Sequence, residues 1–403
     1  MSDRAILHCD LNNFFASVSL LSNQTVKDLP VAVCGSVEER HGIVLAKNEI
    51  AKKFGVKTAQ TVREAKSKCP DLVILSPNYS EYKKYSQAAH RIYERYTDMI
   101  EPFGIDECWL DVTGSRMLFG SGEQIANKIR QDIKSELGIT VSVGVSFNKV
   151  FAKLGSDMKK PDAVTVISRE NFKEKIWGLP IEDLLFVGKR TTDKLNSSGI
   201  FTIGDITLCD DLTLKRLLGK NGVDLKMYAL GLDSSPVVTP DGESKPKSVG
   251  RTVTPGSDIT SNEQVWEIYL SLSEDIADTL KEKGLYAGGI TVHTRTVSLA
   301  VKETSRSFSG GINSSILIAK KAMELFKEVY RWDAPLRSVG LRAINLRSEK
   351  TAVQQDIFGT SSEDEKQELI ESSIDSVRKR FGSKSVKRAT VSKAFNPKSG
   401  LKD

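Results

Sequence analysis

The stretch that decides the fold is residues 104–113, Gly104-Ile105-Asp106-Glu107-Cys108-Trp109-Leu110-Asp111-Val112-Thr113, in which two adjacent carboxylates begin an apolar run. A third carboxylate, Asp10, ends another apolar run near the start of the chain. Carboxylates at the ends of buried strands are costly unless a cation neutralises them. Oxygen ligands of this kind favour Mg²⁺ or Mn²⁺ over zinc. Together the three acids indicate a two-metal site for phosphoryl transfer, although unrelated surface acids remain the alternative.

The segments around these acids predict an α/β sheet. Hydrophobic periodicity and helix-capping signals separate strands from helices here, for example Ser121 and Gln124 at capping-box spacing before a helix that ends at Gly138. The expected elements are strand 5–10, helix 80–98, strand pair 99–113, helix 121–137, strand 139–145, helix 147–158 and strand 163–167. This order favours a ferredoxin-like fold with helices on one face and with Asp10 and Asp106-Glu107 on neighbouring strands.

The rest of the chain changes character several times. Residues 14–77 mix short strands and helices, and residues 168–233 are short helices broken by glycines. Residues 234–248 contain three prolines and indicate a linker. A second α/β unit is expected over residues 249–347, followed by a polar tail over 348–403.

Composition sets outer limits. The chain has 403 residues, 39% of them hydrophobic and 27% charged, which suggests two to four globular domains. No apolar stretch is long enough to span a membrane, and the first residues lack a signal-peptide pattern. Five scattered cysteines without a C-x-x-C pair fit free thiols in the cytoplasm. The net charge of +6 is mild, so the basic segment 374–393 fits either phosphate binding or a solvated tail.

Three sequence blocks carry a resemblance to a known family. They are Asp10-Leu11-Asn12-Asn13-Phe14-Phe15-Ala16-Ser17, Gly104-Ile105-Asp106-Glu107 and Ser156-Asp157-Met158-Lys159-Lys160-Pro161. In this order they closely resemble the Y-family DNA polymerases, the translesion enzymes of the DNA polymerase IV and UmuC type, and the likeness spans essentially the whole chain. The resemblance implies an α+β, multidomain right hand. Its parts are a ferredoxin-like palm (1–13 and 78–167), small fingers (14–77), a helix-hairpin-helix thumb (168–233), a linker (234–248), an α/β little finger (249–347) and a C-terminal tail (348–403).

The resemblance also implies roles for the site residues. Asp10, Asp106 and Glu107 bind two Mg²⁺ ions, with Mn²⁺ as an alternative and the backbone carbonyl of Leu11 as a further ligand. Phe15 is implied to be the steric gate that rejects a 2′-hydroxyl. The remaining nucleotide-binding residues implied are Phe14, Leu45, Lys47, Lys52 and Lys160. For Phe14, ordinary core packing is the alternative.

The fingers depart from the family pattern at two points. Many relatives place a tyrosine and, three residues later, an arginine against the triphosphate, whereas this chain has Glu49 and Lys52. A lysine keeps the charge but loses the bidentate fork, and a glutamate repels phosphate. We therefore expect weakened nucleotide binding or compensation by Lys47. Leu45 replaces a smaller residue over the new base pair and is expected to narrow the tolerance for bulky lesions.

Contacts to DNA and to a partner are implied further along the chain. The turn Val187-Gly188-Lys189 resembles a helix-hairpin-helix turn, whose backbone N–H groups meet a phosphate. Basic residues expected to contact the DNA backbone are Lys189, Lys247, Arg251, Arg295, Arg306 and Arg342; for each, a solvated surface charge is the alternative. Gln354, Ile357 and Phe358 match a pentapeptide that docks on the sliding clamp, unless this segment folds back as a tail helix.

The sequence thus predicts a monomeric, cytoplasmic DNA-directed DNA polymerase of low fidelity that acts in translesion synthesis and DNA repair. Its expected partners are primer–template DNA, dNTPs and the clamp, with no membrane. Two alternatives remain at this stage. One is a nucleotidyl cyclase on the same palm, and the other is a DNA-bound scaffold without activity.

Overall fold

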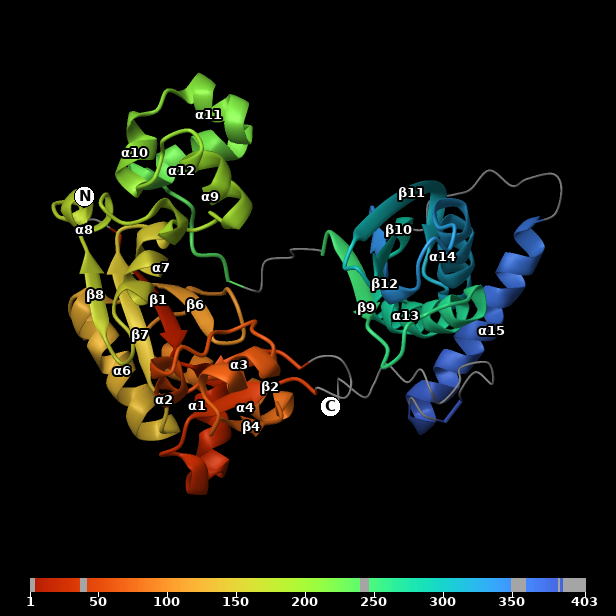
Figure 1. Ribbon diagram of the computed structural model, residues 1–403, viewed down its shortest axis with the longest axis horizontal. Coiled ribbons are helices and arrows are strands. Elements are labelled where there is room, and N and C mark those ends of the chain that lie inside the picture. Colours follow the sequence, from red (N-terminus) through yellow and green to blue (C-terminus); the bar gives the residue numbers. More distant parts are fainter. Residues whose placement is uncertain (1–3, 37–41, 240–245, 349–359, 383–384, 387–403) are drawn as a thin grey trace. The chain divides into compact units, whose positions relative to one another are not determined.

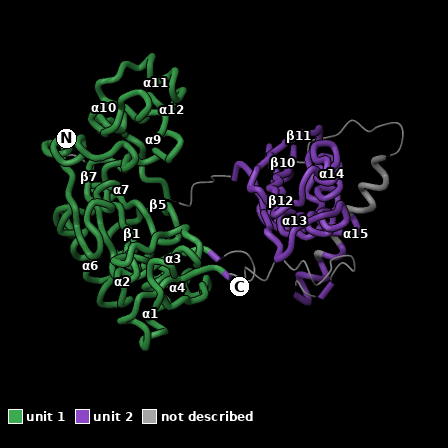
Figure 2. The backbone as a smooth tube through the Cα atoms, viewed as in Figure 1, with its two compact units in different colours: residues 1–35, 43–244 green, residues 36–42, 245–403 purple. Residues whose placement is uncertain are grey.

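The computed structural model describes residues 4–36, 42–239, 246–348, 360–382 and 385–386 (Figure 1). The chain divides into two compact units (Figure 2). Unit 1 comprises residues 1–35 and 43–244, and unit 2 comprises residues 36–42 and 245–403. No helix in the described part of the chain is long and apolar enough to cross a membrane.

Unit 1 is built on a five-stranded sheet in the order β5-β6-β1-β7-β8. Only β7 and β8 run parallel. The sheet and its helices are β1 (Ile6–Leu11), α4 (Tyr79–Tyr93), β5 (Ile100–Pro102), β6 (Glu107–Asp111), α5 (Arg116–Phe119), α6 (Gly122–Leu137), β7 (Val141–Ser146), α7 (Lys149–Met158) and β8 (Val164–Ile167). Ser121 and Gln124 form the expected capping box of α6, and Gly138 ends that helix with φ 69°. The order β1-α4-β5-β6-α6-β7 confirms the expected ferredoxin-like arrangement, to which α7 and β8 are added.

Helices cover both faces of this sheet, so the expectation of helices on one face was wrong. Leu7, Cys9 and Leu11 of β1 face the core that α4 and α6 cover, whereas Ile6 packs with Ala152 of α7. The parallel pair β7–β8 needs a crossover connection, which α7 supplies. Gly144 lets α7 lie directly on the sheet, because a Cβ there would be 1.9 Å from the carbonyl oxygen of Ala152.

Two smaller regions complete unit 1. The segment between β1 and α4 holds a three-stranded sheet in the order β3-β2-β4. Its elements are α1 (Phe14–Ser22), the 3₁₀ turn Gln24–Val26, β2 (Val31–Cys34), β3 (Val44–Lys47), α2 (Glu49–Lys53), α3 (Val62–Lys68) and β4 (Val73–Leu75). After β8 come only short helices, as expected: α8 (Phe172–Ile176), the 3₁₀ turn Ile181–Asp183, α9 (Lys189–Asn196), α10 (Ile203–Leu208), α11 (Asp211–Leu218) and α12 (Lys220–Ala229).

The segment expected as a linker begins as a packed strap. Val237 is buried against Ile6 and Trp109 of the sheet. The backbone N–H of Val238 donates to Glu101, 2.8 Å away, and Arg4 donates to the carbonyl of Ser235 at 3.0 Å. The first residues after α12 are therefore fixed to the five-stranded sheet of unit 1.

Unit 2 repeats the element order βαββαβ with a different strand order, β11-β10-β12-β9. Its elements are β9 (Ser248–Val253), α13 (Asn262–Glu282), β10 (Ala287–Thr296), β11 (Val301–Ile312), α14 (Ser315–Val329) and β12 (Leu336–Ile344), followed by α15 (Thr360–Phe381). Ile290 and Val292 of β10 and Leu341 of β12 join the core formed with α13 and α14. The opposite face of the sheet carries a shallow concavity of about 550 Å³ lined by Thr291, His293 and Arg342, among others.

Candidate active site

The three acids meet at one end of the palm sheet. Asp10, near the end of β1, stands directly opposite Glu107, the first residue of β6. Asp106 lies in the turn just before β6, and its backbone carbonyl accepts a hydrogen bond from the N–H of Leu11 at 3.0 Å. The expectation that Asp10 and Asp106-Glu107 lie on neighbouring strands is therefore confirmed for Asp10 and Glu107, whereas Asp106 lies in the turn beside them.

Two lysines neutralise the acids. Lys153 of α7 donates to Glu107 at 2.8 Å and to Asp10 at 3.4 Å, and its side chain is only 13% exposed. Lys160, two residues beyond α7, donates to Asp10 at 2.7 Å. Asp157 also pairs with both ammonium groups, at 3.2 and 2.9 Å. The site thus holds cationic groups among carboxylate oxygens in a partly buried setting.

The electrostatics of the carboxylates are those of a crowded anionic site. The pKa of Glu107 is raised to about 7, first by burial and then by the nearby Asp10, against the lowering effect of Lys153. Burial and Asp10, in that order, also raise the pKa of Asp106. For Lys153 the surrounding acids outweigh burial, so its pKa is raised and it stays charged. Raised pKa values on neighbouring acidic and basic groups are typical of functional sites, although networks of ion pairs also produce them.

The donor set fits a hard divalent cation. Asp10, Asp106 and Glu107 offer carboxylate oxygens only, and two of them already bind ammonium cations. Within the described residues no three His, Cys, Asp or Glu side chains are close enough to form a metal cluster as they stand. The ammonium of Lys153 bridges Asp10 and Glu107, so these oxygens would be open to a metal ion only if that side chain moved away.

Lys153 is the residue of this site that sequence reasoning missed. Its spacing of four from Asp157 is that of an ordinary surface pair on a helix. Only the contact of α7 with the sheet face that carries Asp10 reveals its role.

Asn12 is a second residue of this region that sequence reasoning did not single out. It accepts hydrogen bonds from the hydroxyl of Thr140 and the N–H of Asp162, and it thereby fixes the loop after Lys160.

The adjacent phenylalanines have different surroundings. Phe15 is partly exposed, and its ring stacks on Tyr82 with centroids 4.2 Å apart and planes 7° apart. Tyr79 meets the same ring edge-on at 5.8 Å. Phe14 is only 2% exposed and belongs to the palm core. Its ring therefore has no free face for a nucleotide, and the core-packing alternative holds for Phe14.

The basic residues of the fingers have partners inside the fingers. Lys47, at the end of β3, donates to the hydroxyl of Thr58 at 3.0 Å, and burial followed by the charge of Lys52 lowers its pKa. Lys52 lies 3.6 Å from Glu49. Leu45 is a half-buried residue of β3. Lys47 is close enough to Lys160 for its pKa to respond to that charge, so the fingers and palm cations share one region.

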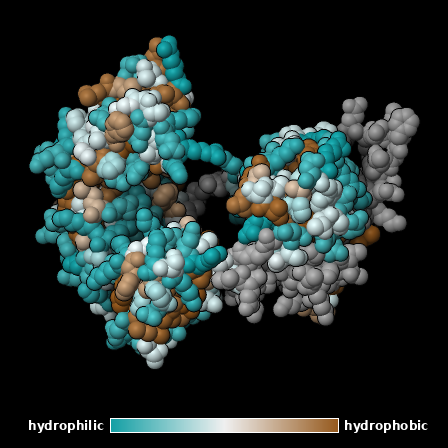
Figure 3. Space-filling model, in the orientation of Figure 1, coloured by the Kyte–Doolittle hydropathy of each residue, from teal (hydrophilic) through white to brown (hydrophobic). Residues whose placement is uncertain are grey.

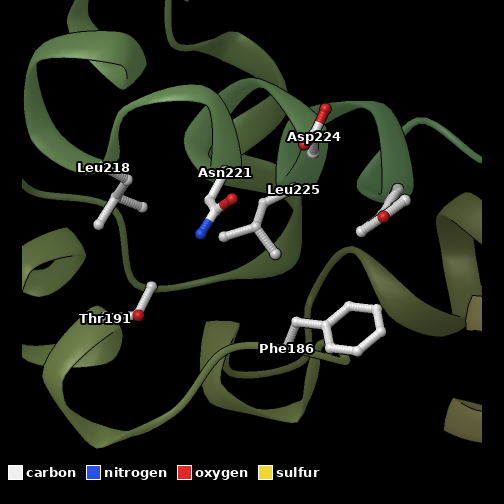
Figure 4. Close-up of a pocket in the computed structure, with 7 residues that line it drawn as sticks. Phe186, Thr191, Leu218, Asn221, Asp224 and Leu225 are labelled. Atoms are coloured by element: carbon white, nitrogen blue, oxygen red, sulfur yellow. The ribbon is translucent and has the colours of Figure 1, made fainter. Parts of the chain in front are cut away.

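The thumb turn is open at its glycine. Gly188 caps α9, and nothing lies within 4 Å of where its Cβ would be; Lys189 is the first residue of that helix. Phe186, just before this turn, has φ 71° and a ring that is 64% exposed. It lines one side of a cavity of about 280 Å³, toward which Leu218, Asn221 and Leu225 point from the other side (Figure 4). Hydrophobic side chains are exposed among hydrophilic ones on the surface of this helical region (Figure 3). Leu208 at the end of α10 is one of its exposed hydrophobic residues.

The predicted DNA-contacting residues of unit 2 comprise two arginines in ion pairs and three further basic residues that differ in their exposure. Arg306 is engaged in a two-pronged ion pair with Glu328 of α14. Arg342 lies in the concavity of the open sheet face and pairs with Glu303 at 3.1 Å. The others are the exposed Lys247 and Arg251 and the half-buried Arg295. Gln354, Ile357 and Phe358 lie outside the described residues.

The fold and this carboxylate end of the palm define a class, the right-handed polymerases that use a metal-binding palm. Residues 9–157 match the family described as impB/mucB/samB, and residues 246–357 match the C-terminal domain of that family. The chain is 50% identical to DNA polymerase IV of Acetivibrio thermocellus over 96% of this chain and 97% of that one. It is 34% identical to DNA polymerase IV 1 of Bacillus subtilis over 97% and 94%.

Among solved structures, a Y-family DNA polymerase chimera (Dbh-Dpo4(243-245)-Dbh) aligns with a TM-score of 0.76 and 25% identity, covering 86% of this chain and all of that one. The chain therefore belongs to the impB/mucB/samB family of Y-family DNA polymerases. It is a DNA-directed DNA polymerase of the translesion, DNA polymerase IV type. This membership sets aside both the cyclase and the inactive scaffold, and it implies divalent metal ions as cofactors.

Proposed function

We propose that this enzyme adds dNTPs to a primer 3′-hydroxyl with two Mg²⁺ ions, or Mn²⁺, held by Asp10, Asp106, Glu107 and the carbonyl of Leu11. The single observation that carries the proposal is the register of Asp10 opposite Glu107, with Asp106 joined to Leu11 across the same strands. Bound there, the ions lower the pKa of the primer hydroxyl and neutralise the charge of the triphosphate.

The palm lysines have a second task in this proposal. Lys160 holds Asp10 in the free enzyme, and its ammonium can turn to the triphosphate once a metal ion takes over that carboxylate. Lys153 can withdraw to Asp157, which already lies 3.2 Å from its ammonium. The acids are thereby kept neutralised before substrate arrives, and positive charge is kept beside the phosphates afterwards.

Selection of the nucleotide falls to the fingers side of the site. Phe15 acts as the steric gate, held flat by its stack on Tyr82. Lys47 and Lys52 supply positive charge for the phosphates, and Leu45 covers the new base pair. The lowered pKa of Lys47 marks it as partly desolvated among other cations, a setting that favours a bound anion.

For DNA, we propose that the thumb binds a backbone phosphate at Gly188 and Lys189, and that the little finger contacts the duplex through its basic residues. Arg251 and Arg342 are the strongest candidates, because both line the open concavity of the sheet, whereas Arg306 is held by two contacts with Glu328. Clamp docking through Gln354, Ile357 and Phe358 rests on the sequence motif. We also propose that the enzyme is a monomer and that it works in the cytoplasm, a reducing compartment with which five free cysteines agree.

Primer extension tests the proposal. Asp106→Ala should abolish dNTP addition by the full chain with Mg²⁺, whereas Asp98→Ala, an exposed acid of the same unit, should leave it near the parent level. Clamp docking is a separate arm, in which Phe358→Ala should lose the stimulation that added sliding clamp gives. Normal extension by Asp106→Ala would refute the metal assignment, and unchanged clamp stimulation would refute the docking motif.

A further inference from the structure

The fingers contain an acid whose place in a triphosphate-binding region needs an explanation. Glu49 is the first residue of α2, and its side chain is 39% exposed. One of its carboxylate oxygens, Oε1, accepts a hydrogen bond from the side-chain amide of Asn13 at 2.9 Å. The same oxygen lies 3.6 Å from the ammonium of Lys52. Glu49 is therefore engaged with the start of α1.

Asn13 sits at the point where β1 turns into α1. Its backbone is left-handed, with φ 48° and ψ 38°, a conformation that asparagine tolerates better than most residues. It occupies the N-cap of α1, yet its side chain makes no capping hydrogen bond. Instead its carbonyl accepts from the N–H of Ser17 at 2.9 Å, while its amide reaches Glu49. One residue thus joins the first turn of α1 to α2.

The second residue after Asn13 is Phe15, the proposed steric gate of the nucleotide site. Phe14 and Phe15 form the first turn of α1, and the Phe15 ring lies on Tyr82. A change in the direction of this turn tilts the ring of Phe15, because the turn is anchored on one side by the core packing of Phe14 and on the other by Asn13.

We propose that Glu49 is a positioning residue for sugar selection, which holds Asn13 and through it the angle of the Phe15 ring. This inference rests on the proposed role of Phe15 as the gate. It explains an acid close to phosphate-binding lysines: its charge is shared with Lys52, and its hydrogen bond orients the helix that carries the gate. Glu49 touches neither substrate nor metal in this role.

The competing explanation is that Glu49 acts only through its negative charge, by weakening the binding of the triphosphate. The two explanations separate in Glu49→Gln, which keeps an oxygen acceptor for Asn13 and removes the charge. They also separate in Asn13→Gly, which keeps a backbone suited to positive φ and removes the amide donor without altering any charge.

The experiment measures kcat and KM for dCTP and for CTP opposite template dG, with the full-length enzyme. Glu49→Ala and Asn13→Gly should each lower the ratio of kcat/KM for dCTP over CTP about fivefold, the effect of one lost hydrogen bond. Glu49→Gln should keep the ratio within about twofold. The double variant Glu49→Ala/Asn13→Gly should be no worse than either single variant, since both remove the same contact.

Other results would overturn the inference. If Glu49→Ala and Glu49→Gln both lower KM for dCTP and neither changes the sugar ratio, Glu49 acts through charge alone. If Asn13→Gly leaves the ratio unchanged, the link through Asn13 is wrong. Phe15→Ala is the reference variant. If Phe15→Ala abolishes the preference for dCTP over CTP while Glu49→Ala and Asn13→Gly keep it, only the positioning role of Glu49 is refuted. An unchanged ratio in Phe15→Ala defeats the gate itself, and the inference with it.

Discussion

Two carboxylates, the partly buried Glu107 of unit 1 and the buried Glu371 of unit 2, have pKa values shifted in opposite directions. Glu107 in the palm has its pKa raised to about 7 by burial and by Asp10. Glu371 of α15 is only 4% exposed, yet its pKa is lowered: burial works to raise it, but hydrogen bonds from the N–H groups of Ile316 and Ser315 and from the Ser315 hydroxyl outweigh burial. The more deeply buried carboxylate therefore has the lowered pKa, so burial alone does not set the direction of the shift.

The difference lies in what surrounds each carboxylate. Glu371 meets the first N–H groups of α14, which are unsatisfied donors at the positive end of a helix. These hydrogen bonds stabilise the ionised carboxylate of Glu371, and they link α15 to the start of α14. Glu107 lies among other acids, and the ammonium of Lys153 that donates to it is shared with Asp10 and Asp157. A carboxylate whose charge is incompletely satisfied is available for a cation from outside, which is what a polymerase palm requires.

The largest effect is expected from Glu107→Gln. Losing one metal-binding carboxylate should reduce kcat for dNTP addition by roughly a thousandfold. The metal-free variant should nevertheless unfold at or above the parent temperature at pH 8, because an amide is not repelled by Asp10. Steady-state primer extension and thermal unfolding in EDTA measure the two quantities. A variant that is inactive because it is less stable would erase the contrast with Glu371.

Glu371→Gln should show the reverse, a loss of stability with little loss of catalysis. Removing the charge from hydrogen bonds at the α14 N-terminus should destabilise the docking of α15 by about 2 kcal/mol. Hydrogen exchange should accelerate in α15 and in the first turn of α14, whereas Glu282→Gln, an exposed acid on α13, should have no effect. Unchanged exchange in α15 would mean that Glu371 does not hold that helix.

The two carboxylates should also give opposite pH dependences. Glu107 binds its proton more tightly folded than unfolded, so without metal the stability of unit 1 should fall as the pH rises from about 4.5 to about 7. Glu371 has a lowered folded pKa, so its contribution is complete above pH 4.5 and is lost as the pH falls through that lower value. Hydrogen exchange of β6 and of α14 in EDTA, corrected for the intrinsic pH effect, follows each unit separately.

Glu107→Gln should flatten the first profile, whose span is at most about 3 kcal/mol for a pKa raised from 4.5 to about 7, and Glu371→Gln should flatten the second. Mg²⁺ should oppose the first slope, since it binds the ionised carboxylate. Parallel profiles in both units would show that their carboxylates do not differ in the way described.

These features differ in how far the sequence alone could predict them. Asp10 and Glu107 were predictable because each adjoins a strongly apolar strand, and period-two patterns predict strands well. The elements of the sheet that carries Asp10 and Glu107 were largely predicted, and for residues 249–347 the α/β character was predicted. The sequence did not predict that α7 covers the second face of the palm sheet, because the pattern of a helix does not tell on which side of a sheet it packs.

Contacts between distant side chains were beyond the sequence. Glu371 and Ser315 are 56 residues apart, and Asn13 and Glu49 are 36 apart. Each partner alone looks like a polar residue on a helix or at a turn. Their pairing depends on how helices pack, which local propensity does not encode. The same reason hides Lys153.

The smallest expected effect extends the comparison to backbone strain. Phe186 holds φ 71° in the thumb, a conformation costly for a bulky residue, and its ring is largely exposed. Phe186→Gly should therefore raise the free energy of unfolding of unit 1 by about 0.5–1 kcal/mol. The matched control is Phe201→Gly, because Phe201 is similarly exposed at 58% and has no positive φ; it should lower stability by a similar amount. Urea unfolding, monitored by hydrogen exchange of the thumb helices, measures the change in unfolding free energy for both variants. If both glycines destabilise the thumb equally, the ring of Phe186 contributes through its contact with Tyr228, 6.0 Å away, and the strain at this turn is negligible.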